Sequence, residues 1–131
     1  MYRVMDTFIM NGYLWRVYIV PANSPELVDR TGERRVATTD GRTHCIYLSN
    51  QLQGNFLITV LVHELGHCIM ISYNLLYDIH KMVKPEFWID AEEWICNFIA
   101  DYGLKIFSVA YSLLGDYALQ FIPHELEKMI G

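Results

Sequence analysis

Two histidines and a glutamate lie close together in an otherwise apolar stretch of the chain, which reads His63-Glu64-Leu65-Gly66-His67. On a helix, residues four apart share one face about one turn apart, so His63 and His67 can reach the same metal ion. Zinc suits neutral imidazole nitrogen, at distances of about 2.0–2.1 Å. Glu64 lies beside the pair and can act as general base toward a water that the metal has made more acidic. The spacing therefore predicts a hydrolytic zinc site.

The apolar surroundings strengthen this prediction. His63, Glu64 and His67 are the strongly polar side chains of a run, residues 58–71, that is otherwise suited to a protein core. Burying such groups without partners would cost several kcal/mol, and binding a cation removes most of that cost. The alternative is that the three side chains make ordinary hydrogen bonds within a helix. Gly66 leaves room for another segment to approach closely.

A catalytic zinc site needs a third protein ligand and one position open to water. The segment 92–101 supplies the candidates, and Glu93 is expected to be the third ligand. Asn97 lies four residues further on the same helical face, and it or Asp101 is expected to hold a ligand histidine by its other ring nitrogen. Glu92 points about 100° away from Glu93 on a helix and is expected to face solvent.

These two segments resemble the ImmA/IrrE-type metallopeptidases, which include many small phage and prophage members. The second motif of that family resembles Glu-x-x-Ala-Asn-x-Phe-Ala, to which Glu93, Asn97 and Ala100 correspond, with Cys96 at the first Ala and Ile99 at the Phe. The resemblance implies a zincin fold in which the leading glutamate binds zinc. It also implies cleavage of a repressor-like protein that regulates transcription.

The elements that must position these residues follow an order of strands and then helices. Aromatic and β-branched runs predict strands at 13–20, 35–39 and 43–48, with a hairpin at Asp40-Gly41 between the last two. Apolar patterning predicts a buried central helix over 51–77, a second long helix over 86–114 with breaks at Gly103 and Gly115, and a short last helix over 124–130. We expect a single α+β domain over 1–131: a minimal zincin-like fold with a small, mainly antiparallel sheet packed on the active-site helix and the second helix.

Composition narrows the classes of function. The chain has 131 residues, 53% of them hydrophobic, which is enough for one domain with a core. A net charge of −5 argues against a nucleic-acid partner. Three cysteines without a CxxC pair, and no uninterrupted apolar core at the N-terminus, predict a cytoplasmic protein without a membrane span.

The sequence thus predicts a zinc metallopeptidase, with one Zn²⁺ per chain held by His63, His67 and Glu93, and with Glu64 as the catalytic base. Its partner would be a protein or peptide substrate. The alternative hypothesis keeps the metal without turnover. The chain would then be a zinc-dependent module that binds and sequesters a regulator or host protein.

Overall fold

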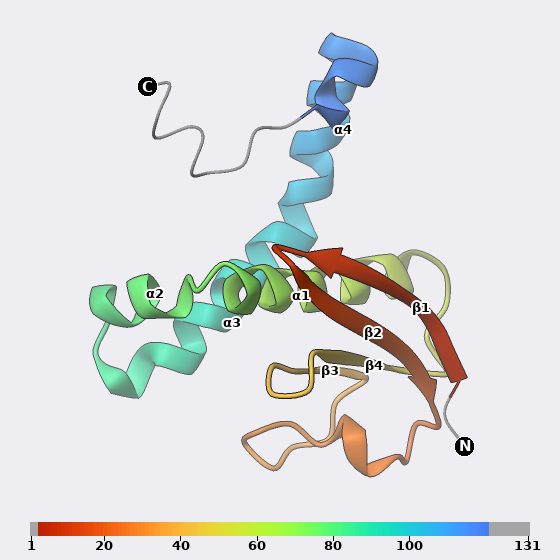
Figure 1. The fold of residues 1–131 in the computed structure, drawn as a ribbon, viewed down its shortest axis with the longest axis vertical. Helices are drawn as coiled ribbons and strands as arrows, with labels where there is room; N and C mark the ends of the chain where they lie inside the picture. Colours follow the sequence, from red (N-terminus) through yellow and green to blue (C-terminus); the bar gives the residue numbers. More distant parts are fainter. Residues whose placement is uncertain (1–2, 121–131) are drawn as a thin grey trace. The chain divides into compact units, whose positions relative to one another are not determined.

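The computed structural model describes residues 3–120, and it shows an α+β fold in which four strands precede the helices (Figure 1). By its internal contacts the chain divides into two compact units, Met1–Ala100 and Asp101–Gly131, and each is described here by itself. The sheet and the predicted site belong to the first unit. The expectation of one domain over 1–131 stays a prediction, and the helix expected over 124–130 lies outside the described residues.

The sheet is mixed, which corrects the expectation of a mainly antiparallel one. Its strands lie in the order β1-β2-β4-β3, with β1 (Arg3–Met10) antiparallel to β2 (Tyr13–Val20) and β3 (Ala37–Asp40) antiparallel to β4 (Cys45–Ser49). The central pair, β2 and β4, is parallel. After β2 the long connection 21–36 leads into β3, which runs in the opposite direction. The next turn reverses the chain again, so β4 runs parallel to β2. The long connection includes the short helix η1 (Pro25–Leu27).

Strand β1 was not predicted, although its turn carries a strong local signal. Asn11 and Gly12 both have positive φ, 49° and 84°. Two central residues of this kind form the tight turns whose twist matches an antiparallel hairpin, and Asn-Gly is the preferred pair. The hairpin between β3 and β4 is present as expected, but its connection is longer than two residues. It includes His44, also at positive φ, which was expected on a strand.

The core of the first unit lies between the sheet and helix α1 (Gly54–Ser72). Alternate residues of β2, Trp15 and Val17, point into it together with Leu48 of β4, and all three are buried. The Trp15 indole Nε1 donates a hydrogen bond of 2.8 Å to Ser72 Oγ at the end of α1. The Trp15 ring is buried and its one polar atom has a hydrogen-bond partner, so this residue holds the helix against the sheet.

Both long helices are shorter than expected. Helix α1 ends at Ser72, and Asn74 at φ 56° turns the chain into α2 (Leu76–Met82). After a short helix, η2 (Pro85–Phe87), α3 (Trp88–Phe98) continues through a π-helical turn, η3 (Ile99–Gly103), into α4 (Leu104–Leu114) and η4 (Gly115–Leu119). The breaks at Gly103 and Gly115 were expected, whereas the π turn was not. Such turns interrupt helices without ending them.

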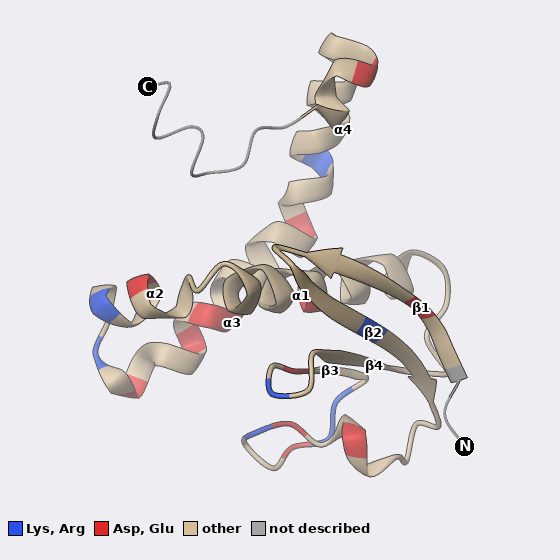
Figure 2. Ribbon diagram, viewed as in Figure 1, with Lys and Arg blue, Asp and Glu red and all other residues tan. Residues whose placement is uncertain are grey.

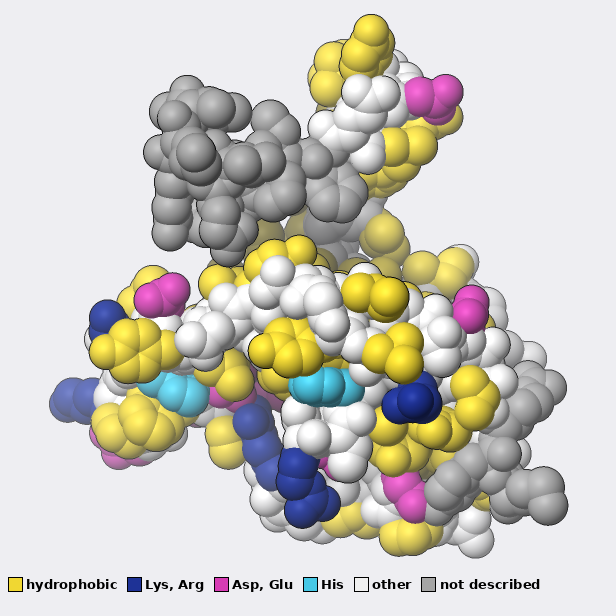
Figure 3. Space-filling model, in the orientation of Figure 1, with side chains coloured by type: hydrophobic (Ala, Val, Ile, Leu, Met, Phe, Trp, Pro, Cys, Tyr) yellow, Lys and Arg dark blue, Asp and Glu magenta, His cyan; other side chains and the backbone are white. Residues whose placement is uncertain are grey.

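Helix α1 is only partly buried, which corrects the expectation of a buried central helix. Glu64 and Cys68 are buried on the side of the sheet and Gly66 on the side of α3, whereas Phe56 and Ile58 are at least half exposed. The face drawn in Figure 3 carries many hydrophobic side chains, with histidine side chains among them. Within residues 3–120, α1 is the helix that is long and apolar enough to cross a membrane. This is weak evidence for a membrane span, because the core helix of a soluble protein passes the same test. Charged residues are sparse on α1 and gather in the connection between β2 and β3 and around α2 and α3 (Figure 2).

Candidate metal centre

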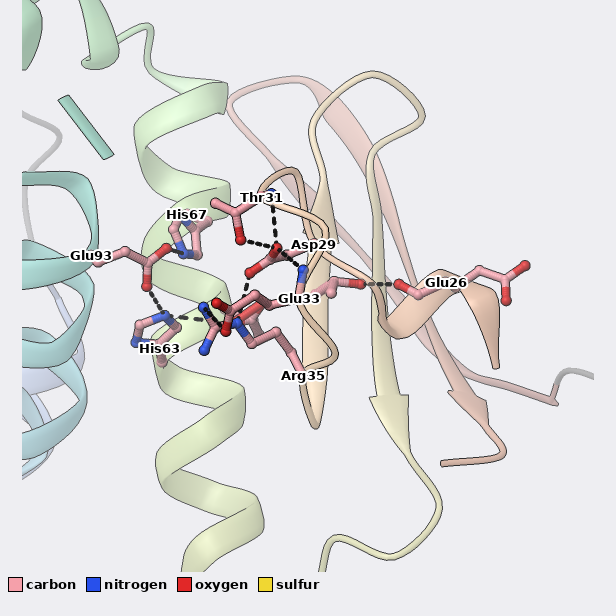
Figure 4. A network of polar contacts seen from close by, with 10 residues as sticks. Glu26, Asp29, Thr31, Glu33, Arg35, His63, His67 and Glu93 are labelled. Atoms are coloured by element: carbon pink, nitrogen blue, oxygen red, sulfur yellow. Dashed lines mark hydrogen bonds and ion pairs between the residues drawn. The ribbon is translucent and has the colours of Figure 1, made fainter. Parts of the chain in front are cut away.

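The structure brings the predicted ligands together between α1 and α3 (Figure 4). His63 and His67 project from α1 toward Glu93 of α3, whose carboxylate lies between the two rings. His63 Nε2 is 3.0 Å from Glu93 Oε2, and His67 Nε2 is 3.2 Å from Glu93 Oε1. The same nitrogen of each ring thus faces the same carboxylate. Both imidazoles are mostly buried, whereas Glu93 remains 43% exposed.

These separations suit a shared tetrahedral metal ion. Bonds of about 2.0–2.2 Å from zinc to nitrogen and oxygen place adjacent ligand atoms roughly 3.3 Å apart. The two nitrogen–oxygen distances lie close to that value. The donor set, two imidazoles and one carboxylate, is also the one that glutamate-type zinc hydrolases use. The residues present therefore fit zinc with little rearrangement of the backbone.

The site holds strongly interacting charges. Hydrogen bonds to His63 and His67 keep the pKa of the Glu93 carboxyl well below its usual range. Burial alone would lower the pKa of His63, but the hydrogen bond to Glu93 and the charges of Glu64 and Glu93 outweigh burial and raise it. A cation in this position would take the place of the histidine proton.

Glu64 lies on the buried side of α1 and is 5% exposed. One carboxylate oxygen lies 3.7 Å from His63 Nε2, while the other accepts a hydrogen bond of 3.1 Å from Thr39 Oγ1. Burial raises the pKa of this carboxyl, against the lowering effect of the histidine charges and of Thr39. A raised pKa brings a carboxylate closer to the range in which a general base works near neutral pH.

Thr39 is a site residue that sequence reasoning missed. It lies at the end of β3, an edge strand of the sheet, and β3 packs against α1. Nothing in its local sequence distinguishes it from other threonines of a strand. The Asp40-Gly41 hairpin signal was the available hint, because it places the preceding residue at one end of the sheet.

The two residues expected to support a histidine differ in position. Asn97 lies one turn after Glu93 on α3 and is a hydrogen-bonding neighbour of His63 that contributes to the raised pKa of that histidine. Asp101 is exposed and belongs to η3 and to the second unit, so its expected supporting role stays a prediction. The supporting role at His63 is proposed for Asn97.

Glu92 is buried rather than solvent-facing, which corrects the prediction. It is 3% exposed, accepts a hydrogen bond from the guanidinium of Arg30, and lies 2.8 Å from His80 Nε2. His80 in turn stacks on Trp88, with ring centroids 4.2 Å apart. Helix α3 has partners on two sides, so Glu92 is covered although Glu93 faces the metal centre, and a buried carboxylate must be paired. From α3, Glu92 thus contacts the β2–β3 connection through Arg30 and α2 through His80.

Replacing Arg30 by alanine should destabilise the fold by about 2 kcal/mol, because Glu92 would keep its burial and lose a charged hydrogen-bond donor. The free energy of unfolding in urea measures the loss. Arg35→Ala is the matched control from the same connection. Its partner Asp29, 2.6 Å away, can be hydrated, so a much smaller loss is expected. Equal losses in the two variants would show that Glu92 does not depend on Arg30.

The connection between β2 and β3 also borders the metal centre. In Figure 4, Asp29, Glu33 and Arg35 lie near His63 and Glu93. The charge of Glu93 is one of the causes that raise the pKa of the Arg35 guanidinium. The ion pairs of this cluster are largely exposed, and they place a basic group beside the site.

Cys96 is a further group close to the two histidines. It lies on α3, three residues after Glu93, and is fully buried. Its Sγ and one ring nitrogen each of His63 and His67 all lie within 4.8 Å of one another. Gly66 permits this approach, because a Cβ there would lie 3.1 Å from Cys96 Sγ. Burial raises the pKa of the thiol to about 12, so it is protonated when no cation is bound.

Comparison of the chain with models of protein families, with curated proteins and with solved structures found no match.

Proposed function

We propose that this protein is a zinc-dependent peptidase. The observation that carries the proposal is the placement of the Glu93 carboxylate between the Nε2 atoms of His63 and His67, with Glu64 buried beside them. Three donors on two helices leave a fourth tetrahedral position for water, which a catalytic zinc site requires. Resemblance to ImmA/IrrE-type metallopeptidases supports the same reading and suggests a regulatory, repressor-like protein as substrate.

In the proposed mechanism His63, His67 and Glu93 hold the ion, which when bound polarises a peptide carbonyl and makes a water molecule more acidic. Glu64 accepts the proton of that water and returns it to the leaving amine. Thr39 donates to one oxygen of Glu64 and so restricts the carboxylate to one orientation. The other oxygen, near His63, is the one directed toward the site.

The sheet suggests how a substrate would lie. β1 and β3 are its two edges, and β3 carries Thr39, which contacts Glu64. An extended peptide that adds to an open sheet edge gains main-chain hydrogen bonds and has its scissile bond held in register. We propose β3 as the edge along which a substrate would bind.

The first test is the metal content of the purified full chain, measured by elemental mass spectrometry after zinc has been offered and excess removed. About one zinc per chain supports the site. A protein that retains no zinc would contradict the proposal. The zinc-loaded protein is then incubated with a proteome-derived peptide library, and new termini are identified by mass spectrometry. A chelator-treated sample serves as the control.

The second candidate function is a zinc-dependent binding module without turnover. The observation that favours it is the burial of Cys96 beside both histidines, because an additional sulfur ligand would close the site to water. Retention of Glu64 favours the peptidase, since a site that only binds zinc has no use for a base.

We expect zinc and protons to compete for His63, so zinc affinity should fall as the pH falls through the raised pKa of this histidine. In the metal-free protein the raised pKa has the opposite consequence. The stability that the protonated ring contributes is complete below its ordinary value of 6.5 and is lost as the pH rises through the folded-state value. Above about pH 6.5, the metal-free protein should therefore lose stability with rising pH, while the stabilisation by added zinc should grow. Thermal unfolding with zinc and with chelator at a series of pH values measures both. A zinc stabilisation independent of pH would contradict histidine ligation.

A further inference from the structure

We propose that Cys96 is a fourth protein ligand of the metal centre, competing with water for the position that hydrolysis requires. The inference rests on the proposed zinc site and adds a regulatory property to it. Neither the general histidine-glutamate pattern nor the resembling family motif, which has alanine at this position, includes a sulfur ligand.

The placement of Cys96 on α3 carries the inference. Residues three apart on a helix lie on the same side, so Glu93 and Cys96 both face α1. The carboxylate contacts the two imidazoles, and the buried Sγ lies within 4.8 Å of a nitrogen of each ring. Nitrogen and sulfur ligands of tetrahedral zinc are roughly 3.6 Å apart. The separations in the structure exceed that value by at most about 1 Å, a difference that a side-chain rotation can supply.

Gly66 leaves the space that the Cys96 sulfur occupies. It faces Cys96 from α1 on the turn between the two histidines, and any larger residue there would press a Cβ against Sγ. The sequence suggested that this glycine allows a close approach beside the site. The structure assigns that approach to Cys96.

Replacement of the water ligand by the Cys96 sulfur involves no change of oxidation state, so it needs no redox partner. The S–H bond breaks, its proton passes to solvent, a bond forms from sulfur to the ion, and the water ligand leaves. Binding of the cation provides the driving force, because a metal-bound thiol is deprotonated outright. A donor set of two nitrogens, one oxygen and one sulfur also favours zinc or cobalt over manganese, since thiolates prefer softer ions. In this closed form the site holds its ion without hydrolysing peptides.

Cobalt(II) provides the test, because thiolate ligation produces an intense sulfur-to-cobalt charge-transfer band in the near ultraviolet, whereas nitrogen and oxygen ligands do not. The metal-free full chain is titrated with cobalt chloride as wild type, Cys96→Ala and Cys68→Ala. Cys68 is the matched control, since it is equally buried and lies on α1. We expect the band in the wild type and in Cys68→Ala, and its complete loss in Cys96→Ala.

The outcomes separate the two proposals. Visible cobalt absorption without the charge-transfer band in the wild type would overturn the role of Cys96 and leave the three-ligand site standing. A band that persists in Cys96→Ala would also overturn it, because the sulfur would come from elsewhere. Failure of the wild type to bind cobalt or zinc would remove the metal site itself. If Cys96→Ala does not fold, as judged by circular dichroism, Cys96→Ser replaces it, because it keeps the volume and removes the soft sulfur.

Discussion

Replacing Glu64 by glutamine should lower peptide hydrolysis by a factor of about 10²–10⁴ while leaving one zinc bound per chain. The amide keeps the size of the side chain and can still accept a hydrogen bond from Thr39, but it cannot take a proton from water. Glu64 contacts the site without lying between the histidines, so metal binding does not depend on it. The measurement is the rate of cleavage of a peptide recovered from the library, with metal content determined on the same preparation.

The same substitution separates the two candidate functions. A peptidase requires its base, so Glu64→Gln should abolish any effect that depends on cleavage. A binding module should keep its partner with unchanged affinity. Undiminished cleavage by Glu64→Gln would contradict the proposed role of this residue.

The second large effect is expected from Glu93→Ala, which should bind zinc more weakly by a factor of more than about 100. Its carboxylate contributes one oxygen toward each histidine, and alanine leaves those imidazoles with no third donor from this position. Loss of an outer partner of a zinc ligand lowers metal affinity by roughly 10–100-fold, so loss of a ligand should cost more than that. Competition with a chromogenic chelator gives the affinity, and elemental analysis gives the stoichiometry.

The neighbouring glutamate provides a matched control within one helix. Glu92 carries the same side chain but pairs with Arg30 and His80, so Glu92→Gln should keep its zinc and lose stability in urea. Zinc retained by Glu93→Ala and lost by Glu92→Gln would mean that the two roles are exchanged. Undiminished zinc affinity in both variants would mean that Glu93 is not a ligand and that His63, His67 and Cys96 hold the ion.

Local sequence patterns were enough to predict four residues of the candidate site, His63, Glu64, His67 and Glu93. A spacing of four on a helix fixes which side chains share a face, whatever the helix packs against, so the pairing of His63 with His67 followed from local geometry alone. The same rule selected Glu93, and the structure places its carboxylate between those two rings. The strand-then-helix order and the α+β class also followed from local patterns.

Which faces of the helices are covered depends on long-range packing and could not be predicted from local patterns. The burial of Glu92 depends on the arrival of Arg30 from the β2–β3 connection and of His80 from α2, contacts across 62 and 12 residues of sequence. Thr39 meets Glu64 because β3 lies against α1, and Cys96 nears the histidines because Gly66 lets α3 approach. The order of the strands in the sheet was likewise not predictable from local sequence. Whether β4 pairs in parallel with β2 is set by how a long connection crosses the sheet, and no local propensity records that path.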